Sequence, residues 1–304
     1  MRFKPRARMA VAGAALCLLA AGGVAWFRAR ALRPASLIAR LPRRDALIAY
    51  IDFQALRRAG ILQLLDGSAT GQDPDYRSFV ERTRFDYARD LDVAVAAFAP
   101  GGKFLLLKGS FDWKSLDAYV RSQNGGCDDS LCRMTGSAPD RLISFFPLHS
   151  NLMALAVSQD DSAALRMSTP APAEQMEIPA APVWVSIPVS ALKSADSIPA
   201  GARPFAEAMG QADSIMLAFG PEGGNVAATL DIRCKKAGDA VEIASRLISA
   251  TGLLRDAMTK ENQQPDPAGL SGMLAAGTFR AEGTRVTGRW PIGKAFLQAV
   301  LGGK

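Results

Sequence analysis

The chain has 304 residues, of which 49% are hydrophobic and 21% charged, a balance typical of about two globular domains. Its formal net charge is +7, but residues 1–44 hold ten Lys and Arg and no acid, which leaves 36 − 10 = 26 basic and 29 acidic residues beyond them, a net of −3. Because the basic excess is confined to the N-terminus, the charge distribution argues against nucleic acid as a partner.

An uncharged apolar segment near the N-terminus predicts attachment to a membrane. It runs from Met9 to Phe27 with basic residues on both sides, and as a helix its nineteen residues would rise about 28 Å, close to the thickness of a hydrocarbon core. We expect residues 1–44 to anchor a bacterial inner-membrane protein whose bulk lies in the periplasm. Cleavage near Ala25 or Ala31 is the alternative, because small residues precede both positions.

Residues 45–168 are predicted to form a first α+β domain. Its expected elements are a strand from Leu47, a helix from Asp73-Pro74, a hairpin around Gly101-Gly102, a helix with Asp112 as its N-cap, and further strands. Alternating strands and helices of this kind predict a sheet that is covered by helices.

Two cysteines in this domain predict a disulfide. Cys127 and Cys132 flank a short loop that could close in an oxidising compartment, which leaves Cys234 without a partner. Free thiols are one alternative. A zinc site is another, but four ligands are normally needed and His149 is the one histidine of the chain.

A Pro-rich linker, residues 169–182, separates this domain from a second one at residues 183–304. Landmarks recur in the same order on the two sides of the linker, which predicts an internal duplication. The matched segments are residues 47–56 with 183–192, 92–100 with 213–221, 117–118 with 239–240, and 146–148 with 290–292.

Each unit is predicted to be ferredoxin-like, a split β-α-β arrangement with an antiparallel sheet and helices on one face, because its elements run strand, helix, hairpin, helix and strands. The long helix of the second unit is expected from Asp239 to about Lys260. Its predicted core-facing stripe consists of Val241, Ala244, Leu247, Ile248, Thr251 and Leu254.

A basic hairpin near the C-terminus is the least ordinary feature of the sequence. A turn at Glu282-Gly283 would place Arg280 opposite Arg285, with Arg289 farther along the same face. Opposed like charges cost stability unless a negative group relieves them. This face is therefore either a solvated surface with carboxylates of the same chain or a docking surface for an anionic partner.

Other residues that could carry chemistry have simpler explanations. His149 is predicted in a hairpin turn, and Asp86 and Asp90 alternate with arginines as in a solvated, ion-paired helix end. Gly101-Gly102 and Gly223-Gly224 suit hairpin turns better than phosphate loops. Asp161 is expected to cap a helix that begins at Ser162. We therefore expect no catalytic residue, no cofactor and no metal.

These patterns favour a non-enzymatic, membrane-anchored interaction or scaffold module of the cell envelope, with an envelope protein as its partner. An envelope enzyme with a scattered site and a periplasmic ligand-binding or inhibitory protein are the alternatives. A deep polar pocket would favour the enzyme, whereas an exposed groove or sheet edge would favour the interaction module. The sequence does not indicate the oligomeric state.

Overall fold

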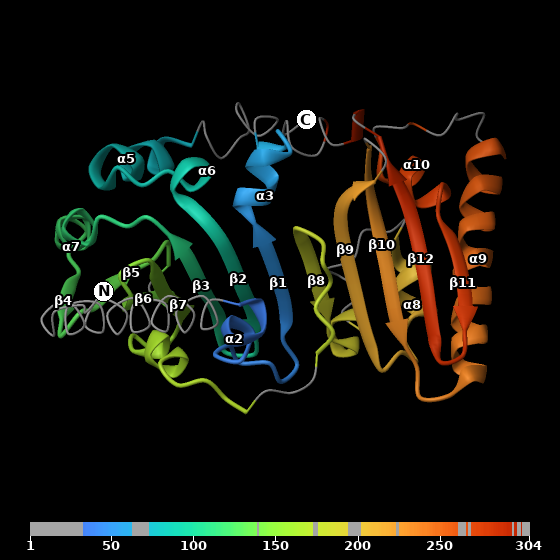
Figure 1. Cartoon of the computed structure of the whole chain (residues 1–304), viewed down its shortest axis with the longest axis horizontal. Coiled ribbons are helices and arrows are strands. Elements are labelled where there is room, and N and C mark those ends of the chain that lie inside the picture. Colours follow the sequence, from blue (N-terminus) through green and yellow to red (C-terminus); the bar gives the residue numbers. More distant parts are fainter. Residues whose placement is uncertain are drawn as a thin grey trace, which may run out of the picture.

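The computed structural model describes residues 33–62, 73–138, 140–172, 176–193, 202–222, 225–260, 266, 269–293, 295–296 and 299. Over these residues the chain forms one large antiparallel sheet with helices packed on it (Figure 1). The predicted anchor, residues 9–27, lies outside the described residues. Of the helices within them, none is both long enough and apolar enough to span a bilayer.

The strands are β1 (Leu47–Asp52), β2 (Leu91–Ala99), β3 (Gly102–Gly109), β4 (Gly126–Asp128), β5 (Leu131–Thr135), β6 (Leu142–His149), β7 (Leu152–Ser158), β8 (Val183–Ile187), β9 (Ser214–Glu222), β10 (Asn225–Arg233), β11 (Thr278–Glu282) and β12 (Arg285–Ile292). They lie in the order β11-β12-β10-β9-β8-β1-β2-β3-β7-β6-β5-β4. Outward from the contact between β8 and β1, the order β8-β9-β10-β12-β11 on one side repeats the order β1-β2-β3-β7-β6 on the other.

The helices are α2 (Pro34–Ile38), α3 (Phe53–Arg58), α5 (Pro74–Thr83), α6 (Tyr87–Asp90), α7 (Trp113–Ser122), α8 (Arg203–Ala208), α9 (Ala237–Lys260) and α10 (Leu270–Ala275), with 3-10 turns η2 (Ala163–Met167) and η3 (Val189–Lys193). The sheet and its helices confirm a mixed α/β protein with a large antiparallel sheet.

The strand order differs from the predicted ferredoxin-like order. In a split β-α-β unit another strand lies between the two strands that the first helix joins, but here β1 pairs directly with β2 and β8 directly with β9. The short helices α3, α5 and α6 between β1 and β2 stay at one end of the sheet (Figure 1). Because they do not carry the chain back across the sheet, it re-enters beside the strand that it left.

The two halves of the chain meet in a seam, the antiparallel pairing of β1 with β8. Tyr50 lies opposite Trp184 in this seam, and their rings stack with centroids 5.3 Å apart. Trp184 is fully buried and shares a hydrophobic cluster with Ile48 and Val95 of the first half. Sheet and core are therefore continuous across the boundary between the two predicted domains.

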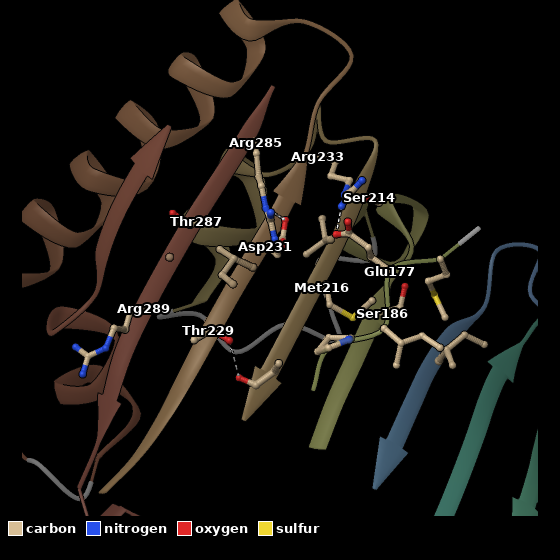
Figure 2. A pocket seen from close by; sticks show the side chains of 18 of the residues that line it. Glu177, Ser186, Ser214, Met216, Thr229, Asp231, Arg233, Arg285, Thr287 and Arg289 are labelled. Carbon is tan, nitrogen blue, oxygen red and sulfur yellow. Dashed lines mark hydrogen bonds and ion pairs between the residues drawn. The ribbon is translucent and has the colours of Figure 1, made fainter. Parts of the chain in front are cut away.

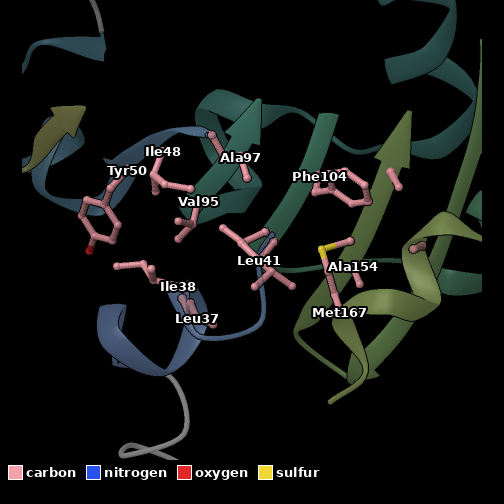
Figure 3. Close-up of a cluster of buried hydrophobic side chains, with 14 of the residues drawn as sticks. Leu37, Ile38, Leu41, Ile48, Tyr50, Val95, Ala97, Phe104, Ala154 and Met167 are labelled. Atoms are coloured by element: carbon pink, nitrogen blue, oxygen red, sulfur yellow. The ribbon is translucent and has the colours of Figure 1, made fainter. Parts of the chain in front are cut away.

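The two faces of the sheet are covered differently. Face A, the face that carries Tyr50 and Trp184, is covered over β1, β2, β3 and β7 by α2 and η2 (Figure 3). Face B is covered by α3, α5 and α7 in the first half and by α8, α9 and α10 in the second. Over β9 to β12, no described helix packs on face A.

The predicted linker is described only in part, and its described residues lie against the rest of the chain. The amide of Ala171 donates to the carbonyl of Ala39, and the amide of Asp52 donates to the carbonyl of Pro182, both at 2.7 Å. Met176 and Ile178 pack on the hydrophobic cluster of face A. We call residues 176–182 the strap.

Helix α9 forms where it was expected, but its predicted stripe was partly wrong. Val241 and Ile248 are 62% and 54% exposed. The buried positions are Ala240, Ile243, Ala244, Leu247, Ala250, Thr251 and Met258. The real stripe is rotated towards smaller side chains, because alanines allow the helix to approach the sheet closely.

The predicted disulfide is confirmed. Cys127 and Cys132 lie directly opposite each other in the β4–β5 hairpin, and their sulfurs are bonded at 2.04 Å. Cys234 is free and buried. The bond closes the hairpin at the end of the sheet that the short strand β4 forms.

Removal of the tryptophan in the seam should destabilise the whole fold. We expect Trp184→Ala to lower the free energy of unfolding by about 3–5 kcal/mol, because it empties a large buried volume. Urea denaturation followed by circular dichroism would measure the change. Leu253→Ala is the matched control, since Leu253 is 69% exposed and its loss should cost under about 0.5 kcal/mol. Equal effects of the two changes would contradict this role of the seam.

Loss of the disulfide should cost about 2 kcal/mol of stability, because the loop that it closes is short. The double variant Cys127→Ala with Cys132→Ala should unfold at lower urea than the oxidised protein. Reductant should lower the stability of the wild-type protein to that of the double variant, and it should leave the stability of the double variant unchanged. A wild type that is insensitive to reductant would refute this contribution.

Candidate functional site

The candidate site is the uncovered half of face A, which the strand β12 shows most clearly. Its side chains alternate strictly between exposed and buried positions. Arg285, Thr287 and Arg289 point into solvent on face A, whereas Val286 and Trp290 are buried beneath α9 and α10. The alternation follows from the two-residue period of a strand with one buried side.

The register of the β11–β12 hairpin differs from the predicted one. Glu282 lies opposite Arg285, and Arg280 lies opposite Thr287. The predicted opposition of Arg280 and Arg285 was therefore wrong, although both side chains share face A. The turn begins one residue later than expected, at Gly283, whose φ of 55° supplies the positive value that a two-residue hairpin turn needs at its first position.

A pair of like charges does face each other, one strand farther in. Arg233 of β10 lies directly opposite Arg285 of β12. Each has an acidic partner, since Arg285 donates from Nε to Asp231 Oδ1 at 2.9 Å and Arg233 forms an ion pair with Glu177 of the strap (Figure 2). Two carboxylates thus relieve the repulsion that direct opposition would cause.

The three arginines predicted for a docking face differ in their partners. Arg285 pairs with Asp231, and Arg289 donates from Nε to Glu222 at 2.9 Å. Both guanidinium side chains remain about half exposed, at 51% and 48%. Arg280 is exposed and makes no ion pair with any residue that the structure describes. The same-chain carboxylates expected of a solvated face are therefore present for two of the three.

These ion pairs shift the ionisation of their members. Hydrogen bonds from Arg289 hold the pKa of Glu222 below its ordinary value, and those to Asp231 raise the pKa of Arg285. A hydrogen bond to a charged form favours that form. Glu222 and Arg285 are thus charged over the whole range near neutral pH.

A groove of about 960 Å³ lies between the strap and the hairpin of β11 and β12 (Figure 2). Hydroxyl groups line its floor, from Ser186, Ser214, Thr229 and Thr287. Five arginines and two carboxylates also line it: Arg43, Arg233, Arg280, Arg285, Arg289, Glu177 and Asp231. The groove therefore presents an excess of positive charge.

A second hollow of about 710 Å³ lies on the other side of the strap. The stacked pair Tyr50 and Trp184 lines it together with Asp52 and Arg58. Burial and the nearby carboxylate of Asp52 raise the pKa of Tyr50. Both hollows share Ile178 and Pro179 of the strap, so the strap borders each of them.

The paired carboxylates weighed for acid–base chemistry serve local structure. Asp86 accepts a hydrogen bond from the Tyr76 hydroxyl at 3.1 Å, and Asp90 is ion-paired with Arg89 at 2.8 Å. The hydrogen bond from Arg89 lowers the pKa of Asp90, while burial raises the pKa of Tyr76 to about 12. These contacts hold the segment that leads into β2 in place.

The remaining candidates lie apart from the groove. His149 is exposed at the end of β6, and Gly101, with a φ of 93°, occupies the β2–β3 turn; Gly223-Gly224 lies outside the described residues. The predicted cap at Asp161 was wrong, because η2 has Ser162 at its N-cap and no side-chain hydrogen bond caps it. Asp160 accepts from the amide of Ser162 at 2.9 Å, and its bonds to Ser162 and Arg166 lower its pKa to about 2.

Sequence reasoning missed the acidic members of this face, Glu177, Glu222 and Asp231, and also Arg233. A signal was available for β10, where Thr229, Asp231 and Arg233 alternate with apolar residues. The sequence carries no comparable signal for Glu177, because its contact with Arg233 spans 56 residues of chain.

No protein-family model and no curated protein sequence matches the chain. Solved structures that resemble it include two crystal forms of TP0453. Form IV has a TM-score of 0.45 and 12% sequence identity, over 88% of this chain and 96% of that one. Form III has a TM-score of 0.45 and 11% identity, over 87% and 97%. Both are distant likenesses.

Replacement of Arg289 by Gln should raise the pKa of Glu222 towards its ordinary value, because its hydrogen-bond donor is lost. Carboxyl carbon shifts followed by NMR against pH would measure it, with Arg280→Gln as the control that leaves Glu222 unchanged. Because the pKa of Glu222 is lower in the folded state than in the unfolded state, its pair with Arg289 stabilises the fold at pH values above the ordinary pKa. This stabilisation is lost as the pH falls through the folded-state pKa of Glu222. An identical titration in both variants would contradict the pairing.

Proposed function

We propose that the protein is a non-enzymatic interaction module of the bacterial cell envelope, held at the inner membrane by residues 9–27, that docks an acidic partner on the uncovered half of face A. One observation carries the proposal. The sheet face that α2 and η2 cover in the first half is open and rich in arginine in the second. An antiparallel sheet can leave one face to solvent or to a partner.

The partner is expected to be acidic because of the chemistry of this face. Arginine forks suit bidentate contacts with carboxylates, and Arg280 has no ion-pair partner among the described residues. Beyond residue 44 the groove lining has four arginines and two carboxylates, although that part of the chain has a net charge of 26 − 29 = −3. Positive charge is therefore concentrated on this face against the trend of the folded part.

We also propose that the two halves, residues 45–168 and 183–304, arose by duplication. The repeated order of strand pairing supports this, and so does the match of residues 92–100 with 213–221, which correspond to β2 and β9. On this view both copies kept the sheet and its helices on face B. In the first half face A is closed by η2 and by α2, which precedes residue 45, and in the second half it is left for the partner.

The disulfide supports an extracytoplasmic location, because such bonds persist in oxidising compartments and are rare in the cytosol. A periplasmic ligand-binding protein is the second candidate. The hollow above the buried pair Tyr50 and Trp184 favours it, since small-molecule sites are concave and combine apolar residues with a few polar groups.

Exchange of Arg280, Arg285 and Arg289 to Gln in one variant should reduce recovery of the partner after cross-linking in cells and extraction in detergent. The loss relative to the wild type should be larger at low than at moderate salt, because salt screens the attraction that these three charges contribute. Melting temperatures would show that the fold is intact.

The matched control exchanges three other ion-paired, exposed arginines, Arg121, Arg166 and Arg246. It removes the same charge but leaves the groove unchanged, so recovery should stay at the wild-type level. Equal recovery with both triple variants would refute the docking face.

A further inference from the structure

The strap already places one carboxylate in the groove. Glu177 forms an ion pair with Arg233, and its charge also acts on Arg285, the cross-strand neighbour of Arg233. Met176 and Ile178 on either side of it pack against the hydrophobic cluster of face A. Exposure alternates along these three residues, as in an extended segment that turns every second side chain to the sheet.

The two carboxylates of the groove differ in how readily they can be exchanged. Asp231 belongs to β10, inside the sheet, and is 26% exposed. Its short side chain and its place in an inner strand keep it close to Arg285. Glu177 is 70% exposed and lies in a segment that is neither helix nor strand. A rotation of its side chain alone frees Arg233.

The rest of the groove has room for further carboxylates beside the strap. Arg280 is exposed there without an ion-pair partner among the described residues. The hydroxyl-bearing Thr229 lies opposite Arg289 on β10, and Thr287 lies two residues from Arg289 on β12 (Figure 2). The chain's own N-terminal segment does not suit the groove, because residues 1–44 contain ten basic residues and no acid. An acidic segment of another molecule has the charge that complements the groove.

We infer that the groove binds an extended acidic segment of a partner protein, and that Glu177 of the strap is an intramolecular competitor which that segment displaces from Arg233. The inference rests on the proposed docking function. It adds the chemical form of the partner, carboxylates carried along an extended chain, and a contact that limits its affinity. Removal of the Glu177 charge should therefore strengthen binding, whereas removal of the Arg280 charge should weaken it.

Binding of a hexaglutamate peptide to the purified protein tests this, with hexaglutamine as the control peptide. In fluorescence anisotropy at low salt, Glu177→Gln should lower the Kd for hexaglutamate about two- to fivefold, the range expected for one exposed charge pair. Arg280→Gln should raise the Kd by a similar factor. Hexaglutamine should bind neither variant.

Glu242→Gln is the matched control, because it also removes one carboxylate from an exposed ion pair with an arginine, Arg246, but on α9. It changes the net charge equally and should leave the Kd unchanged. Equal effects of Glu177→Gln and Glu242→Gln would overturn the inference, since general charge would then explain the change. Binding to vesicles with anionic lipid but not to hexaglutamate would also overturn it.

The two proposals can fail separately. If the triple arginine variant recovers its partner undiminished, the docking function fails, whatever Glu177 does. If that variant loses its partner but Glu177→Gln does not strengthen hexaglutamate binding, only the competition by the strap is refuted.

Discussion

Tyr50 and Trp184 stack across the pairing of β1 with β8, and this pairing joins two groups of strands that would otherwise each have an open edge. The stack is buried, so it also fuses the hydrophobic cores of the two halves. The strap is fixed by the same contact, because it ends at β8 and the carbonyl of Pro182 accepts from Asp52. The position of Glu177 beside the arginines therefore depends on the seam.

Small side chains explain why face A is closed over the first half. Ala154, Ala156, Ala163 and Ala164 are fully buried there, which lets η2 lie close to β7. Over the second half the equivalent face carries long charged side chains of β10 and β12. Burial of these charges beneath a helix would cost more than packing could return. The same strand order is therefore covered on face A in the first half of the chain and open on face A in the second.

The local sequence pattern predicted the secondary-structure elements and the sheet face on which the arginines lie. It could do so because the two-residue period of β12 and the single buried side of α9 are local properties. It failed where the result depends on small differences or distant contacts. One residue in the position of the turn changed the partners of Arg280, and the choice between Val241 and Ala240 for the core of α9 depended on how closely the helix packs. The pairing of β1 with β8 spans more than 130 residues and has no local signal.

The chemistry of the open face also indicates what kind of complex it suits. Arginines, carboxylates and hydroxyls line it together with apolar residues beside the strap, among them Met176, Ile178 and Met216, whereas the large aromatic residue of the hairpin, Trp290, points to the core. Permanent interfaces depend on buried apolar anchors. A face whose large aromatic residue is buried in the core gains mainly from complementary charge, which speeds encounter and sets orientation but is weakened by salt. Binding there should be reversible. The carboxylate of Glu177 on the strap can compete with a partner only if the partner binds weakly in this way.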